Sequence, residues 1–421
     1  MLTVNFALGN LKTIASANVS SRGGAAGAPV SQNVLTRAQL AALPTNNSLN
    51  NMIQTVPGIV KFSYNEPVAN GFHGLTYEID GAPIPQATTS NFAEMIDPKN
   101  VDSLEVFTGA FPAEFGGSRM GAVVNIQTNR LSDLQRPEEG SVTIGAGNYG
   151  QSLSSLSEAL KLTPTSELFL NANAQSSARG LDTPTYAPIH DHSSQSDQFL
   201  RYIASLGTQN SLAFDFSNQL AQFQIPINTD PKDPTDPQVS VPGTDDVQRE
   251  YDRYANFNFT HVSRDGNGVL QVIPWVRYTR VAYDGDLSND VQATQGGQNL
   301  AGLREDQRAT YTGLRLSDLR TSSHHAVKVG LDVSRENYAA TTLLAAPASE
   351  PGLPYTASQS AVAHAGSQIG IYAQDKWSPS RVLTVGYGVR YDRSTGFTSG
   401  FQISPRIGVN IAPDDKNVVH F

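Results

Sequence analysis

Residues 106–128 read VFTGAFPAEFGGSRMGAVVNIQT, and this stretch decides the fold. Four glycines within it supply bends that a residue with a Cβ would resist, namely Gly109, Gly116, Gly117 and Gly121. Residues 122–126 then return to an apolar, strand-like character. The stretch therefore predicts short strands that are linked through tight, glycine-dependent backbone.

Two stretches upstream extend this pattern. Residues 77–84 read YEIDGAPI, in which the step from Asp80 to Gly81 is a turn signal after alternating residues. Residues 49–59 read LNNMIQTVPGI, and we expect short helices over residues 36–43 and 48–55. In this order the three stretches resemble the plug domain of TonB-dependent outer-membrane receptors. The resemblance implies a small α/β domain inside a large β-barrel, with Asp80, Gly81 and the four glycines as its framework.

The composition narrows the possible classes of protein. The chain has 421 residues, a formal net charge of −9 and no cysteine. The acidic balance argues against nucleic acid as the principal partner. The lack of cysteine excludes disulfides, thiolate metal sites and a cysteine nucleophile. No apolar run reaches the roughly 18 residues of a transmembrane helix. A transmembrane β-barrel remains possible, because its average hydropathy is unremarkable.

From residue 132 onward, apolar and polar residues alternate with a period of two. The clearest segments are residues 327–334, 383–392 and 401–411. In the second of these, the apolar set alternates with glycine, threonine and charged residues and consists of Leu383, Val385, Tyr387, Val389 and Tyr391. A strand that separates lipid from water requires this period.

The predicted connections differ in length in a regular way. Brief turns lie near residues 163–166, 207–210, 264–268, 320–323, 378–381 and 413–417, and long polar linkers cover residues 179–196, 221–247, 284–303 and 339–366. Short turns on one rim and long loops on the other are the outer-membrane arrangement. Trp377, Tyr391 and Phe401 lie at predicted strand ends, where interfacial aromatic girdles form.

The predicted fold is mainly β: a truncated, transmembrane antiparallel β-barrel with a small α/β plug domain inside. We expect about twelve complete strands and one begun at Lys416, roughly half of the 22 strands of plugged transporters. Residues 36–131 would form the plug, and residues 132–421 the incomplete barrel. Residues 1–12 alternate like a strand and lack the basic region of a signal peptide. The resemblance makes them the last strand of a truncated N-terminal β-sandwich domain of the carboxypeptidase-regulatory-like type, so the chain is expected to begin inside a longer protein.

Residues 13–35 are predicted to form a linker that contains one candidate functional segment. The resemblance implies a short coupling segment ahead of the plug, which the periplasmic end of TonB captures by β-augmentation. The segment in the corresponding place is Thr13, Ile14, Ala15, Ser16 and Ala17. A plain linker is the competing interpretation.

Two features of the sequence suggest other chemistry. Residues 145–150 read GAGNYG, a formal match to a dinucleotide-binding fingerprint, and Leu153, Leu156 and Leu160 follow at helical spacing. No repeated βαβ series follows, so a glycine-rich first barrel hairpin is favoured. The His190/His192 and His324-His325 pairs lack a third ligand placed by spacing, so no metal site is predicted. We find no catalytic constellation and predict no cofactor and no enzyme activity.

The resemblance implies energy-dependent uptake of a scarce extracellular ligand across the cell outer membrane of a Gram-negative-type bacterium. The implied partners are TonB with its inner-membrane energising complex, outer-membrane lipid, and a ligand such as a siderophore, cobalamin, an oligosaccharide or a peptide. The four long linkers are the candidate ligand contacts. Two other classes stay open: an outer-membrane surface-binding, adhesion or secretion-linked barrel protein, and a soluble β-rich enzyme.

Overall fold

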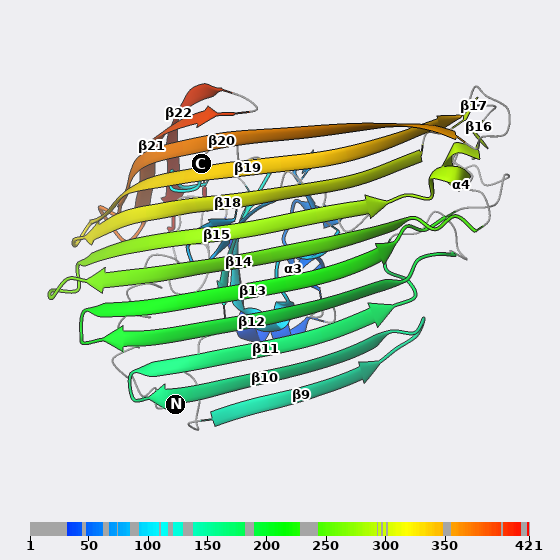
Figure 1. Cartoon of the computed structure of the whole chain (residues 1–421). Helices are drawn as coiled ribbons and strands as arrows, with labels where there is room; N and C mark the ends of the chain where they lie inside the picture. The colour runs from blue at the N-terminus through cyan, green and yellow to red at the C-terminus, as the bar shows by residue number, and fades with distance from the viewer. Residues whose placement is uncertain are drawn as a thin grey trace.

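A computed structural model shows a small domain surrounded by a curved sheet of long strands (Figure 1). It describes residues 32–43, 48–61, 67–73, 75–84, 92–108, 111–116, 121–128, 138–181, 189–227, 243–292, 294–295, 298–299, 302–347, 355–396, 399–413 and 419–420. Within these ranges no helix is both long and apolar enough to cross a membrane. The predicted sandwich strand over residues 1–12 and the candidate coupling segment both lie outside the described residues.

The small domain, the plug, is built on a five-stranded sheet in the order β1-β7-β8-β5-β6. Strand β5 pairs in parallel with β8, and the other neighbours are antiparallel. The bounds are β1 (Gln32–Thr36), β7 (Val101–Phe107), β8 (Val123–Thr128), β5 (Thr76–Ile79) and β6 (Ala82–Ile84). A smaller antiparallel sheet contains β2 (Ile59–Lys61), β3 (Pro67–Ala69) and β4 (Phe72–His73). The predicted YEIDGAPI hairpin is confirmed as β5–β6, and the predicted apolar strand is β8.

Three short helical segments complete the plug: α2 (Arg37–Ala42), α3 (Leu49–Ile53) and the 3-10 helix η3 (Pro98–Asn100). Thr36 forms a capping box with Gln39, in which each side chain bonds to the other residue's backbone N–H. Ser48 caps α3 by accepting the backbone N–H of Asn51 at 3.2 Å. Both predicted helices are therefore confirmed, and polar side chains that satisfy free N–H groups set their starts.

The plug core is apolar and continues into the surrounding wall. Leu49, Leu104, Val106, Val124 and Ile126 are fully buried in the plug. The same cluster includes side chains from the inner face of the wall, namely Phe169, Phe199, Tyr254, Trp275 and Tyr311. Burial of this surface joins plug and wall into one core.

The wall is one antiparallel sheet of 13 strands in sequence order, with β9 at one edge and β23 at the other (Figure 1). Its bounds are β9 (Glu138–Ala146), β10 (Ser152–Thr163), β11 (Ser166–Ser177), β12 (Ser193–Leu206), β13 (Asn210–Gln224), β14 (Val247–Val262), β15 (Gly268–Asp284), β18 (Gly302–Thr321), β19 (His325–Pro347), β20 (Tyr355–Trp377), β21 (Leu383–Thr395), β22 (Gly400–Ile411) and β23 (Val419–His420). The prediction of twelve complete strands and one begun is confirmed, although Lys416 itself lies outside the described residues. GAGNYG ends β9 and starts the turn to β10, so Leu153, Leu156 and Leu160 lie in a strand and not in a helix.

The connections follow the predicted alternation with one clear error. Turns such as 163–166 and 207–210 join strands directly, while the linker after β15 contains α4 (Leu287–Gln292) and the short strands β16 (Thr294–Gln295) and β17 (Gln298–Asn299). The predicted loop over residues 339–366 is wrong. There β19 and β20 stay paired as far as Pro347 and Tyr355, because small and β-branched residues continue the strand beyond the strictly alternating segment.

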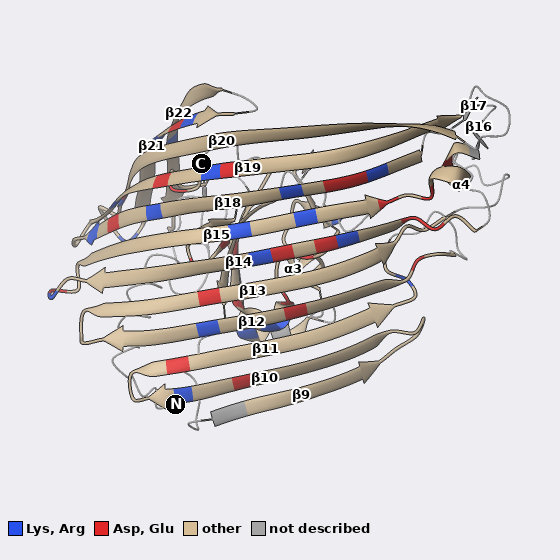
Figure 2. Cartoon of the chain, viewed as in Figure 1, with Lys and Arg blue, Asp and Glu red and all other residues tan. Residues whose placement is uncertain are grey.

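The two faces of the wall differ as the period of two predicts. Val327, Val329 and Val333 lie on the outer face and are 40–44% exposed. On the inner face of the neighbouring strand, Arg315 contacts the plug. Charged residues occur in most strands but gather at the long-loop end of β14, β15 and β18 (Figure 2). Tyr391 stacks on Phe401 with ring centroids 6.3 Å apart, beside the connection between β21 and β22.

Candidate functional site: the plug–barrel interface

The turn of the β5–β6 hairpin in the plug forms polar contacts with the wall. Asp80 and Gly81 have φ values of +50° and +82°, which a tight two-residue hairpin requires and which glycine adopts without strain. The Asp80 carbonyl accepts a hydrogen bond from Asn258 of β14 at 3.3 Å, and the Gly81 carbonyl accepts one from Arg315 of β18 at 2.9 Å. Two wall strands therefore bond to the two residues of one turn.

The Asp80 side chain adds a third wall strand to this contact. Its buried carboxylate accepts hydrogen bonds from the backbone N–H and the hydroxyl of Thr128 at the end of β8. It also forms an ion pair with Arg201 of β12, whose guanidinium lies 3.3 Å from Asp215 of β13. A buried charge is tolerated only where it is paired and hydrogen-bonded, and this cluster meets that condition.

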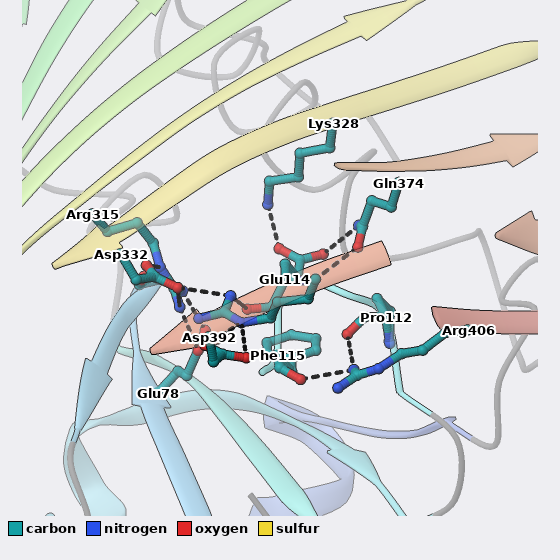
Figure 3. Close-up of polar contacts among 12 residues, drawn as sticks. Glu78, Pro112, Glu114, Phe115, Arg315, Lys328, Asp332, Gln374, Asp392 and Arg406 are labelled. Atoms are coloured by element: carbon teal, nitrogen blue, oxygen red, sulfur yellow. Dashed lines mark hydrogen bonds and ion pairs between the residues drawn. The ribbon is translucent and has the colours of Figure 1, made fainter. Parts of the chain in front are cut away.

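The densest part of the interface is a chain of alternating charges around Arg315 (Figure 3). Its guanidinium bonds to both carboxylate oxygens of Glu78 in β5, at 2.8 and 3.0 Å. Its Nε lies 2.6 Å from Asp332 of β19, which in turn lies 3.0 Å from Nη1 of Arg390 in β21. Arg390 also bonds to both oxygens of Asp392, at 2.9 and 3.0 Å. The plug supplies Glu78, and the wall supplies the rest.

Residues 111–116, a loop of the plug, are bound by the wall strands β19 to β22 (Figure 3). The carboxylate of Glu114 forms an ion pair with Lys328 of β19 and accepts a hydrogen bond from Gln374 of β20 at 3.0 Å. The backbone N–H of Glu114 donates to the same Gln374 side chain at 2.9 Å, and its carbonyl accepts from Arg390 at 3.1 Å. Burial alone would raise the pKa of Glu114, but the ammonium of Lys328 and these bonds hold it below its ordinary value.

Arg406 of β22 binds the same plug loop through three backbone carbonyls. Its Nη1 donates to the carbonyls of Phe111, Pro112 and Phe115 at 2.8, 2.5 and 2.7 Å. A Cβ at Gly116 would collide with the side chain of Arg390. The predicted framework role of Gly116 therefore has a specific reason in this structure, which is close approach of the plug backbone to an arginine of the wall.

The other side of the plug is held by carboxylates of the wall. Glu250 of β14 accepts the backbone N–H groups of Phe92 and Ala93 at 2.6 and 2.9 Å. Asp197 of β12 accepts from Asn100 at 3.1 Å. Asn173 of β11 donates to Asp97 of the plug. Polar contacts thus tie the plug to strands from β11 to β22, and water could replace them if the plug moved.

Within the plug itself, two buried carboxyl groups are unusual. Burial raises the pKa of Glu94, although Ser48 and the backbone N–H of Leu49 and Asn50 donate to it at the start of α3. Burial raises the pKa of Glu105 to about 8, although Asn125 of the paired strand donates to it at 3.0 Å. These groups stabilise the plug most when they carry a proton.

The structure brings Asp80, Gly81 and Gly116 to this interface. Gly121 lies two residues before β8 and has a φ of +79°. Gly109 and Gly117 lie outside the described residues. The wall residues of the interface, above all Arg315 and Arg390, were not predicted. Their only signal in the sequence is a charge on the inward-facing set of a long strand.

The histidine pairs make ordinary polar contacts. His190 bonds to the Ile225 carbonyl and to Asp245, and His325 bonds to Asp375. In the described ranges no group of three or more metal-binding side chains occurs.

Comparison with known families agrees with this geometry. Residues 25–123 match the TonB-dependent Receptor Plug Domain, and residues 144–420 match the TonB dependent receptor-like, beta-barrel family. The chain belongs to the TonB-dependent receptor family. Both matched families are receptor families and neither is an enzyme family, so the comparison gives no support to the soluble β-rich enzyme.

Solved structures share the fold of this TonB-dependent receptor. The chain is similar to the ferripyoverdine receptor of the Pseudomonas aeruginosa outer membrane, with a TM-score of 0.73 and 17% identity, over 94% of this chain and 56% of that one. It is also similar to the ferric yersiniabactin uptake receptor from Yersinia pestis, with a TM-score of 0.68 and 13% identity, over 93% and 64%. The FrpB iron transporter from Neisseria meningitidis gives a TM-score of 0.69 and 14% identity, over 93% and 63%.

The chain therefore spans between 56% and 64% of the length of these solved relatives. No curated protein matches its sequence. At identities of 13–17% the likeness establishes the fold alone.

Proposed function

We propose that this chain is part of an outer-membrane receptor that imports a scarce extracellular ligand when TonB pulls on its plug. The observation that carries the proposal is the polar interface between plug and wall. Beside the apolar core that plug and wall share, the interface is rich in ion pairs and hydrogen bonds, which can exchange with water when the plug moves. A plug held in this way can stay closed at rest and rearrange under force.

The proposed placement is the outer membrane of a Gram-negative-type bacterium, and the proposed partners are TonB with its inner-membrane energising complex. The proposed plug is the predicted residues 36–131 together with residues 32–35, which the sequence assigned to the linker but which belong to β1 of the plug sheet. Residues 132–421 would be part of the barrel. Residues 1–12 would end an N-terminal sandwich domain of the carboxypeptidase-regulatory-like type. Ferric siderophores are the ligand class to test first, because the names of two similar receptors specify ferripyoverdine and ferric yersiniabactin.

The proposed coupling segment is Thr13, Ile14, Ala15, Ser16 and Ala17, captured by TonB as an added strand. The test uses the full-length receptor and measures ligand binding and ligand uptake separately, in cells with and without TonB. Deletion of residues 1–17 should abolish uptake and leave binding intact. Ile14→Pro should have the same effect, because proline removes a backbone N–H that an added strand needs.

The matched control is Ala26→Pro, which places the same change in the linker but outside the proposed segment. Uptake that survives Ile14→Pro would show that the coupling segment lies elsewhere. Uptake that is independent of TonB would contradict the proposed mechanism. Normal uptake together with lost surface attachment in a deletion strain would favour the adhesion or secretion-linked alternative.

A further inference from the structure

A carboxylate lies on the outer face of the wall at its short-turn rim, on strand β20. Asp375 is two residues from the end of this strand. Gln374 contacts the plug loop on the inner face, so the alternation of side chains places Asp375 on the outer face. The same outward set contains the exposed Ile369 and Ile371, as expected for a strand that faces lipid. A carboxylate in this set needs an explanation.

Two neighbouring side chains hold this carboxylate by one of its oxygens. Nδ1 of His325, at the start of β19, donates to Oδ2 of Asp375 at 2.7 Å. The hydroxyl of Tyr387, which the register pairs with Asp375 across β21, donates to the same oxygen at 2.7 Å. The ring of His325 also stacks on its register partner Trp377, with centroids 6.2 Å apart. Three adjacent strands therefore contribute to one polar and aromatic cluster.

The second carboxylate oxygen of Asp375 is buried and lacks a partner. Only 8% of Asp375 is exposed, and Oδ1 receives no hydrogen bond from any residue that the structure describes. Within the same described ranges, no lysine or arginine forms an ion pair with this carboxylate. A buried carboxylate is costly unless it is paired and hydrogen-bonded. We therefore expect a cationic donor from another molecule at Oδ1.

The surroundings of Asp375 favour the ammonium group of a lipid as this donor. Trp377 and Tyr387 are 38% and 45% exposed, and aromatic rings attract cations over their faces. Tryptophan and tyrosine at strand ends mark the headgroup level of a membrane. Two residues further from the rim, the same outer face carries the exposed Val329 and Val389, which suit acyl chains. Short turns face the periplasm, so the lipid belongs to the inner leaflet.

We propose that Asp375 binds the primary ammonium of an aminophospholipid, such as phosphatidylethanolamine, in the inner leaflet of the outer membrane. The ammonium donates to Oδ1 and lies against the ring of Trp377, while His325 and Tyr387 hold the carboxylate by Oδ2. His325 and Tyr387 are both partly exposed, so they can shift aside to admit the headgroup. The inference rests on the proposed outer-membrane placement and not on the identity of the transported ligand.

The test titrates the purified full-length receptor in detergent with phosphatidylethanolamine and with phosphatidylcholine of the same acyl chains. Phosphatidylethanolamine should bind about tenfold more tightly, because its ammonium donates a charge-assisted hydrogen bond that a trimethylated ammonium cannot donate. In Asp375→Asn this ratio of affinities should fall to about one, while binding of phosphatidylcholine changes little and reports an intact wall. The matched control is Asp265→Asn, which removes an exposed carboxylate from the β14–β15 turn at the same rim and should keep the ratio.

Tyr387→Phe is the second variant, since it removes one hydrogen bond to Oδ2 but keeps the carboxylate. Its ratio should lie between those of Asp375→Asn and the unmodified receptor. Equal affinities for the two lipids in the unmodified receptor would overturn the proposal, as would an unchanged ratio in Asp375→Asn. Displacement of the lipid by soluble phosphoethanolamine at the lipid's own concentration would show that the ligand is a free amine and not a lipid. The titration contains no transported ligand, so its failure is distinct from a failure of the uptake assay.

Discussion

Replacing Arg315 by methionine should loosen the plug hairpin selectively. The substitution leaves the carboxylate of Glu78, whose side chain is 2% exposed, without its two-bond partner and the Gly81 carbonyl without its donor. Removing one partner of a buried pair costs about 3–5 kcal/mol, because the other charge stays buried. We expect the lower end, about 3 kcal/mol, since Arg201 and Asn258 still hold the turn.

Hydrogen–deuterium exchange of the full-length receptor in detergent measures this effect directly. A loss of about 3 kcal/mol in local opening free energy corresponds to roughly a hundredfold faster exchange in β5 and β6. Exchange in the wall strands β10 and β11, which do not contact Arg315, should not change. Arg315→Lys should give an intermediate increase, because it keeps the charge but loses the two-bond geometry.

The matched control is Asp332→Asn, which removes the wall carboxylate from the same guanidinium but keeps both plug contacts of Arg315. Its effect on exchange in β5 and β6 should be much smaller. If Arg315→Met leaves this exchange unchanged, the alternating charges do not hold the plug. If Asp332→Asn accelerates it equally, the wall geometry matters more than the plug contact.

Three further predictions concern the plug. Gly116→Ala should destabilise plug docking by about 1–3 kcal/mol, because its Cβ collides with Arg390. The control is Gly145→Ala, whose Cβ meets only an ordinary contact at 3.6 Å and which should be neutral. The rate at which a protease cleaves the plug is measured for both variants. Gly81→Ala should cost about 1–2 kcal/mol through its φ of +82°, seen as faster exchange in the hairpin alone. The folded-state pKa of Glu105, about 8, lies above its ordinary value of 4.5, so plug stability should fall as the pH rises from 4.5 to about 8. Glu105→Gln should reduce that dependence to the part that Glu94 contributes, and it should match the unmodified plug near pH 4. An unchanged pH profile would refute the assignment.

The sequence predicted local structure wherever the backbone preference of a single residue type favours one conformation. Asp80-Gly81 predicted its hairpin because the turn needs two positive φ values. The predicted helix ranges begin at Thr36 and Ser48, and the structure supplies the reason: both side chains accept free N–H groups at the start of a helix. The predicted polar linker over residues 339–366 is wrong because small and polar residues stay in a strand where a neighbouring strand pairs with them.

The interface could not be predicted in the same way. Glu78 and Arg315 are 237 positions apart in sequence, and Glu114 and Gln374 are 260 apart. Alternation shows that Arg315 faces one side of a strand, but not which plug atom lies opposite. That choice depends on the position of the plug in the barrel, which the packing of both domains sets together.

The sequence alone therefore determined the class of fold, the strand count, and the glycine and aspartate positions of the plug, because these depend on the backbone preferences of single residues and on a period of two. Only the tertiary structure decided which charges meet. It placed Arg315 against the plug hairpin and Arg308 on the outer face of the same strand. The physical reason is that one strand presents two faces, and the environment of each face is fixed only when the sheet curves around the plug.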